Sequence, residues 1–159
     1  MTLAERTTAP DLQAAYAPLF ARVGSRDEPT LVSLSLTVEG VDPDALHGLA
    51  RPLGVSLWMQ PDVGVSLVGE GEAWAARQSH EARFGIVSGA FGLLLLGAIV
   101  VAPSVPGGAG ALLLGGFGFV DEPAQSFVWA VFEAGCMPLP AVLLTTTPEG
   151  AWLTASMVV

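Results

Sequence analysis

The clearest pattern along the chain is an alternation of apolar and polar residues over positions 30–38. In this stretch Leu34, Leu36 and Val38 are each preceded by a serine or a threonine. A period of two residues is typical of a β-strand with one face against a core and the other toward water. We therefore predict a half-buried strand over residues 30–38.

Ahead of this strand, apolar residues recur at helical spacing. Tyr16, Leu19 and Val23 would share one face of a helix. The pattern predicts an amphipathic helix over residues 9–24. Pro18 lies within it and favours a kink or a helix start at that point.

Two shorter helices are predicted further along the chain. Asp42 is a good N-cap and Pro43 suits the first helical position, which predicts a helix over residues 42–51. Residues 73–83 form a polar segment that includes Arg77, and we predict a second short helix there.

Two pairs of alternating segments predict β-hairpins, each with a turn that begins at a proline. The first pair is 54–60 and 63–69, and the second pair is 139–147 and 151–159. Residues 111–119 are a glycine-rich strand candidate between the two hairpins. Glycines in a strand usually indicate a close approach of another backbone, a bulge or a ligand on the main chain. The two phenylalanines of this segment, Phe117 and Phe119, would point to one face.

The segment 84–102 contains no charged residue. A membrane-spanning helix needs about 20 mainly apolar residues, and this segment is long enough. It also contains Gly85 and Gly89 in the GxxxG spacing associated with close helix packing in lipid. The other interpretation is a buried helix packed on a sheet, and the polar residues that lead into the segment favour it. A membrane span stays open as the alternative.

Composition is compatible with one domain over residues 1–159. Apolar residues make up 52% and charged residues 13%, which excludes a disordered chain. The net charge is −9, and the chain contains no lysine. Nucleic-acid binding is therefore not expected, because clustered cations would be needed to neutralise phosphates.

Possible nucleotide and metal sites are poorly supported by their spacing. The segment Gly69–Trp74 imitates the start of a dinucleotide-binding loop, but it places two glutamates where phosphates would lie and has Trp74 in place of the third glycine. His47 and His80 are far apart, and neither has ligand spacing to another histidine or cysteine.

Nucleophilic and acid–base candidates are equally weak. Cys136 is the only cysteine and has no neighbouring histidine, so we expect a small buried side chain rather than a nucleophile. Asp121 and Glu122 precede a proline, which is more typical of a solvated turn than of a catalytic pair. We predict no catalytic, cofactor-binding or metal-binding residue in this chain.

The cellular location is expected to be the cytoplasm. A single cysteine cannot form an intrachain disulfide, so nothing points to an oxidising compartment. Residues 1–10 lack the apolar core of a secretory signal.

Three segments, in order, resemble the isochorismate synthases among the chorismate-utilising enzymes, and together they cover roughly residues 30–159. The first is similar to an early hairpin of that family, the second to its Gly-Gly-Phe-x-Phe strand, and the third to a Trp-x-x-Phe motif followed by a proline-containing strand. These segments are Leu57–Asp62 with Val68–Trp74, Gly115–Phe119, and Trp129–Phe132 with Met137–Leu144 and Trp152–Thr154.

This resemblance implies an α+β fold, with an antiparallel sheet and helices packed on one side, that forms half of the chorismate-utilising fold. It favours a buried helix over a membrane span at residues 84–102. The family converts chorismate to isochorismate with Mg²⁺, on the way to menaquinone or a siderophore, and uses a lysine as base and glutamates for the metal and as acid. Because the chain has no lysine, the resemblance implies an N-terminal part without the catalytic region.

Two other functions stay open at this point. The chain could be a binding or regulatory module without chemistry, or a small membrane protein with a span over residues 84–102. For an enzyme part, the expected partner is a separately encoded catalytic half or a second copy of the chain. No cofactor is expected in the chain itself, and Mg²⁺ is implied only for the complete enzyme.

Overall fold

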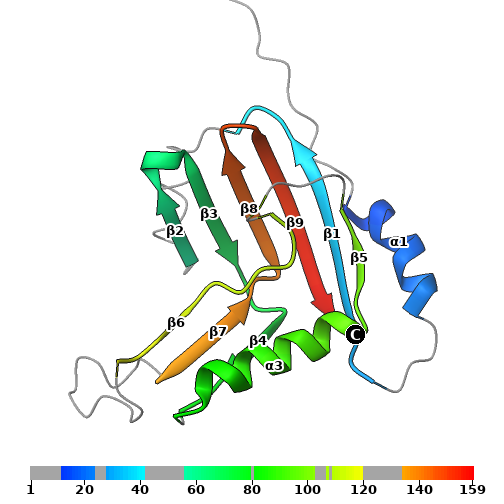
Figure 1. Cartoon of the computed structure of the whole chain (residues 1–159). Coiled ribbons are helices and arrows are strands. Elements are labelled where there is room, and N and C mark those ends of the chain that lie inside the picture. Colours follow the sequence, from blue (N-terminus) through cyan, green and yellow to red (C-terminus); the bar gives the residue numbers. More distant parts are fainter. Residues whose placement is uncertain are drawn as a thin grey trace, which may run out of the picture.

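The computed structural model describes residues 12–23, 28–41, 56–79, 81–102, 107, 109–119 and 134–159. Within these ranges the helices are α1 (Leu12–Val23) and α3 (Arg83–Leu96), with a short 3₁₀ turn at Pro61–Val63. The strands are β1 (Leu31–Val38), β2 (Ser56–Gln60), β3 (Val65–Glu70), β4 (Trp74–Arg77), β5 (Ile99–Val101), β6 (Gly116–Phe117), β7 (Gly135–Leu139), β8 (Val142–Thr147) and β9 (Gly150–Val158). The strands form two sheets, and the predicted α+β class is confirmed (Figure 1).

The larger sheet has six strands in the order β2-β3-β8-β9-β1-β5. Neighbouring strands are antiparallel, except that β1 and β5 run parallel. The longest pairing in the sheet is that of β1 and β9, in register from Leu31 opposite Val158 to Val38 opposite Ala151. Both predicted hairpins are present in this sheet, as β2–β3 and β8–β9.

The strand predicted over residues 30–38 is β1, and over residues 31–35 it is buried on both faces instead of one. Ser33 is 0% exposed and Ser35 is 1% exposed, although they alternate with the apolar core residues Val32 and Leu34. This part of the sheet lies between two layers of chain, so the polar face of the strand is shielded from water at Ser33 and Ser35, whereas Thr37 is exposed.

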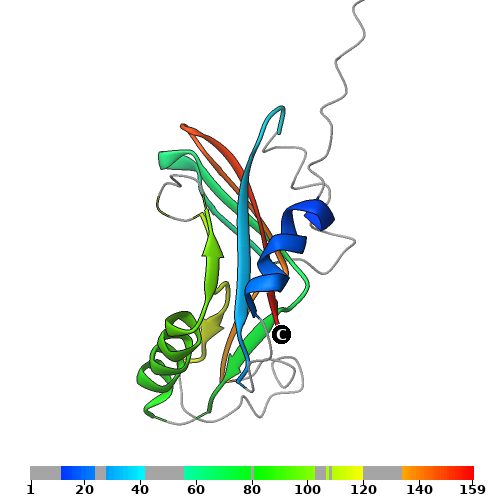
Figure 2. The ribbon, with the colours of Figure 1, turned by 90° about the vertical axis from the view of Figure 1, so that its right-hand side faces the viewer.

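Helix α1 covers one face of the larger sheet, next to β1 and β5 (Figure 2). It joins the sheet through one apolar cluster, whose buried members are Tyr16, Leu19, Val32, Leu34, Ile99 and Ala155. The helix predicted over residues 9–24 is therefore confirmed, with Pro18 inside it.

Helix α3 lies on the other side of the larger sheet from α1 (Figure 2), whereas the helices were expected on one side. It packs instead beside β4, where the rings of Trp74 and Phe91 stack with their centroids 6.2 Å apart. This position arises because β4 belongs to a second sheet of three strands, in the order β4-β7-β6.

The helix predicted over residues 73–83 is wrong for most of its length. Trp74–Arg77 is the strand β4, antiparallel to β7 with Trp74 opposite Leu139, and helix α3 begins only at Arg83. Pairing with a strand that is distant in the sequence overrides the local preference of this polar segment.

The uncharged segment 84–102 is divided between two elements. Helix α3 ends at Leu96, and after Gly97 and Ala98 the β-branched residues of β5 pair with β1. Among the helices in the described residues, none is long and apolar enough to cross a membrane.

The strand predicted over residues 139–147 is also divided. It belongs to β7 and β8, which meet at Pro140 and Ala141. Their partners β3 and β4 meet in the same region at Gly71, which has a positive φ of 67°. Thus one pair of strands bends from the larger sheet into the smaller one. The helix predicted over residues 42–51 lies outside the described residues.

Candidate functional site

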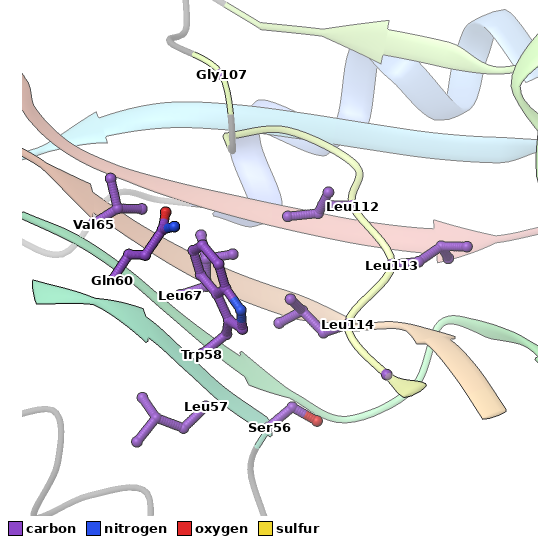
Figure 3. A pocket seen from close by; sticks show the side chains of 11 residues that line it. Ser56, Leu57, Trp58, Gln60, Val65, Leu67, Gly107, Leu112, Leu113 and Leu114 are labelled. Carbon is purple, nitrogen blue, oxygen red and sulfur yellow. The ribbon is translucent and has the colours of Figure 1, made fainter. Parts of the chain in front are cut away.

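A cavity of about 680 Å³ lies on the face of the larger sheet opposite α1, over β2 and β3 (Figure 3). The strand register places it there, because Leu67 is opposite Thr145, and Thr145 is opposite Trp152. In β9, Ala151 and Leu153 flank Trp152 and lie on the α1 side of the sheet. Leu67, Thr145 and Trp152 therefore lie on the opposite face. We call this cavity the Trp58 pocket.

The floor and the roof of the Trp58 pocket come from parts of the chain that are far apart in the sequence. Strands β2 and β3 supply the floor, where Trp58 is directly opposite Leu67. The segment 112–115 crosses this face and supplies the roof (Figure 3). The lining residues are Ser56, Leu57, Trp58, Gln60, Val65, Leu67, Gly107, Leu112, Leu113, Leu114 and Gly115.

Backbone hydrogen bonds and a close approach hold the roof segment in place. The amide of Leu114 donates to the carbonyl oxygen of Pro138 at 2.9 Å, and its side chain packs with Leu67 and Leu143 in a buried cluster. At Gly115, a Cβ atom would overlap the carbonyl oxygen of Cys136. The close backbone approach predicted for the glycine-rich segment is confirmed here, although only Gly116–Phe117 is a strand within it.

Phe117 and Phe119 do not act as one aromatic face. The ring of Phe117 packs on Phe84 of α3 with centroids 4.5 Å apart. Phe119 is fully exposed. Consequently neither phenylalanine lines the Trp58 pocket.

Buried hydroxyl groups lie on the same face of the sheet, across β1 and β9. The Oγ atoms of Ser33 and Ser156 are 3.0 Å apart, and Ser35 Oγ is 2.8 Å from Thr154 Oγ1. The amide of Gly110 also donates to Thr154 Oγ1 at 3.2 Å. Because these hydroxyls satisfy one another inside the protein, they stabilise the sheet and are unsuited to nucleophilic attack.

Charged side chains lie away from the Trp58 pocket in the described residues. Arg77 forms a bidentate pair with Glu72 at 3.1 and 2.5 Å, with both side chains more than 40% exposed. Arg83 is buried, donates to the carbonyl oxygen of Gly118 at 3.0 Å and lies over the ring of Phe84. The described residues that line the Trp58 pocket are therefore uncharged.

Of the residues weighed as site candidates in the sequence, the structure describes the segment Gly69–Trp74 and Cys136. In that segment, Glu72 forms a salt bridge with Arg77, and Gly71 has a left-handed backbone conformation where the strands bend. Cys136 is a partly buried residue of β7. His47, His80, Asp121 and Glu122 lie outside the described residues.

Within the described ranges, no group of three or more histidine, cysteine, aspartate or glutamate residues could hold a metal ion. Mg²⁺ takes carboxylate and water oxygens in octahedral geometry. The described residues therefore do not provide a set of ligands that fits Mg²⁺.

The pocket was missed from the sequence because its roof depends on long-range packing. Trp58 and the leucines at 112–114 were visible as apolar positions, but no local pattern shows that they face one another. The one sequence feature that pointed to the roof was Gly115, because a glycine in a strand indicates that another backbone comes close.

Comparison with protein-family models finds a match over residues 18–159 to a family described as chorismate binding enzyme. This match spans most of the chain, including both sheets. Searches of curated proteins and of solved structures found no match.

Proposed function

The chain belongs to the chorismate binding enzyme family, and from this premise we propose that it is the N-terminal part of an isochorismate synthase. The order of three segments supports this finer assignment. The hairpin and loop from Leu57 to Trp74, the segment Gly115–Phe119 and the strand region Met137–Leu144 resemble isochorismate synthases in the same order along the chain.

The absence of lysine is the single observation that carries the mechanistic part of the proposal. Converting chorismate to isochorismate adds water at one ring carbon while a hydroxyl group leaves another. This exchange needs a base near the attacking water and an acid near the leaving hydroxyl. Isochorismate synthases use a lysine as that base, and this chain has none, so we propose that it does not turn chorismate over by itself.

In this proposal the chain has a structural role in the complete enzyme. Its bent strand pair and the paired hydroxyls of β1 and β9 form a rigid double-sheet framework. A catalytic region that carries the lysine and the metal-binding glutamates would complete the enzyme. The proposed product would enter menaquinone or siderophore biosynthesis, and the proposed location is the cytoplasm.

Exposed apolar side chains support the proposal that this framework binds a protein partner. On α3, Leu93 is 72% exposed and Leu96 is 85% exposed. Exposed apolar patches of this kind mark protein interfaces. Among the described strands, β2 and β5 are the edges of the larger sheet, and edge strands are common places for pairing with another chain. We propose that the partner is a separately encoded catalytic half or a second copy of the chain.

The proposed function is tested by incubating the purified chain with chorismate and Mg²⁺ and separating the products by chromatography. No isochorismate above the level in buffer is expected, and a complete isochorismate synthase serves as the positive control. Sustained formation of isochorismate by this chain alone would overturn the proposal.

A non-catalytic binding module is the second candidate function. The Trp58 pocket favours it, because a formed cavity with a mainly apolar wall can hold a ligand without any catalytic group.

A further inference from the structure

The Trp58 pocket has the size of a small-molecule site. Its volume of about 680 Å³ lies within the range of about 300–1,000 Å³ that is typical of ligand pockets. Apolar side chains line it from both sides, with Trp58, Val65 and Leu67 from the sheet and the three leucines at 112–114 from the roof segment (Figure 3).

The polar groups of the pocket are few and uncharged. Gln60 contributes an amide and Ser56 a hydroxyl, and the indole of Trp58 adds one N–H donor. Among the described residues that line the pocket, none carries a charge. A charged ligand would lose its hydration here without gaining an ion pair, which is costly.

The overall charge of the chain acts in the same direction. A net charge of −9 repels anions, and the described arginines nearest in sequence, Arg77 and Arg83, are held by Glu72 and by the Gly118 carbonyl. Chorismate, which carries two carboxylates, is therefore the wrong ligand for this pocket. An uncharged molecule fits the chemistry of this pocket better.

The position of Trp58 indicates the shape of that molecule. Its side chain is 45% exposed, an unusual amount for the largest apolar residue type, and it stands between the floor and the roof of the cavity (Figure 3). An exposed indole face in a cavity favours stacking with a planar ring. Gln60 and Ser56 at the same wall can each accept or donate one hydrogen bond to a polar substituent.

We propose that the Trp58 pocket binds an uncharged small molecule with a planar aromatic ring. This site is separate from any chorismate site, and its ligand is recognised by stacking on Trp58, by the leucine roof and by the amide of Gln60. The proposal goes beyond the proposed function, because it holds whether or not the chain takes part in isochorismate formation.

The test uses two fluorescent probes with the same ring system. N-phenylnaphthylamine is neutral, whereas anilinonaphthalene sulfonate carries one negative charge. We expect a saturable rise in the fluorescence of the neutral probe, and binding of the sulfonate that is weaker by about tenfold or more, equivalent to about 1.4 kcal/mol. Equal or tighter binding of the sulfonate would overturn the proposal.

Variants locate the bound probe. Trp58→Ala removes the stacking wall and should weaken binding of the neutral probe by about tenfold or more. Leu96→Ala is the matched control, because it changes an apolar residue that is 85% exposed on α3, outside the pocket, and it should leave the affinity unchanged. Loss of affinity in Leu96→Ala but not in Trp58→Ala would place the probe on α3 and overturn the proposal.

A second pocket variant keeps the test decisive if Trp58→Ala folds poorly. Gln60 is an exposed residue at the end of the edge strand β2, so Gln60→Lys should fold normally. The added cation should improve binding of the sulfonate relative to the neutral probe. An unchanged ratio of the two affinities would show that the probes bind elsewhere.

Discussion

The hydroxyl group of Tyr16 in α1 donates a hydrogen bond to the carbonyl oxygen of Ala155 in β9, which is 139 positions later in the chain. Burial raises the pKa of this tyrosine above its ordinary value of 10.0, and a hydrogen bond with the backbone of Leu34 offsets part of that rise. Tyr16 is the only tyrosine in the sequence, so its ionisation can be followed directly by absorbance.

Alkaline pH should destabilise the fold through Tyr16. Its pKa is higher in the folded chain than in the unfolded chain, so the folded state holds the phenolic proton more tightly. This contribution is complete below the unfolded pKa of about 10 and is lost as the pH rises through the folded pKa. Thermal unfolding over an alkaline pH series should show the loss, and Tyr16→Phe should flatten it. Parallel profiles for the two proteins would contradict this account.

At neutral pH, Tyr16→Phe should lower the free energy of unfolding by about 1 kcal/mol. The ring keeps its place in the apolar cluster, and the hydroxyl group is removed together with its hydrogen bonds to the backbone of Ala155 and Leu34. Urea unfolding followed by circular dichroism measures the difference. No change in the unfolding midpoint would show that the hydroxyl does not stabilise the docking of α1.

Substitution of two adjacent glycines should separate close packing from strand propensity. A Cβ at Gly115 would meet the backbone at Cys136 and Met137, whereas a Cβ at Gly116 would meet nothing within 4 Å. Gly115→Ala should therefore lower the free energy of unfolding by about 1–3 kcal/mol or more. Gly116→Ala, the control, should change it by less than about 1 kcal/mol. Similar unfolding curves for both variants would contradict the position of the roof segment.

The hydroxyl pair of Ser33 and Ser156 should show energetic coupling. Each single change to alanine leaves the other hydroxyl buried without this partner, at a cost of about 1–3 kcal/mol. Because the second change removes that orphaned group, the double variant should lose less than the sum of the single variants. A double-mutant cycle in urea measures the coupling, which we expect to be at least about 0.5 kcal/mol. Strict additivity would mean that the two hydroxyls do not interact.

Self-association through α3 should depend on its exposed leucines. Leu93→Glu and Leu96→Glu together place charges on the apolar surface and should reduce the mass measured by light scattering at high protein concentration. Val63→Glu is the control, since Val63 is 53% exposed at the turn between β2 and β3. An unchanged mass for the double variant would overturn self-association by this surface.

Local patterns were sufficient for elements that are defined by their own residues. The helix that contains Tyr16 and Leu19, the strand around Leu34 and the two hairpins follow from apolar spacing and turn residues. The strands β4 and β5 could not be predicted in this way. They are short, and their conformation depends on partners at β7 and β1 that are distant in the sequence.

The candidate site was harder to predict for the same reason. Trp58 and Leu112 were simply apolar residues in the sequence, and only the course of the roof segment across the same face of the sheet makes them walls of one cavity. Likewise, Ser33 and Ser35 looked like the solvent face of a strand. Their burial follows from a second layer of chain on that face, which a period of two residues does not reveal.

We propose that this member of the chorismate binding enzyme family does not form isochorismate by itself, because its sequence contains no lysine to act as the base. The most direct test is a single-turnover assay with the chain in excess over chorismate, in the presence of Mg²⁺, with products separated by chromatography. The account predicts that chorismate is consumed no faster than in buffer alone. A complete isochorismate synthase should convert it under the same conditions. Conversion of chorismate to isochorismate by the chain alone would contradict the account.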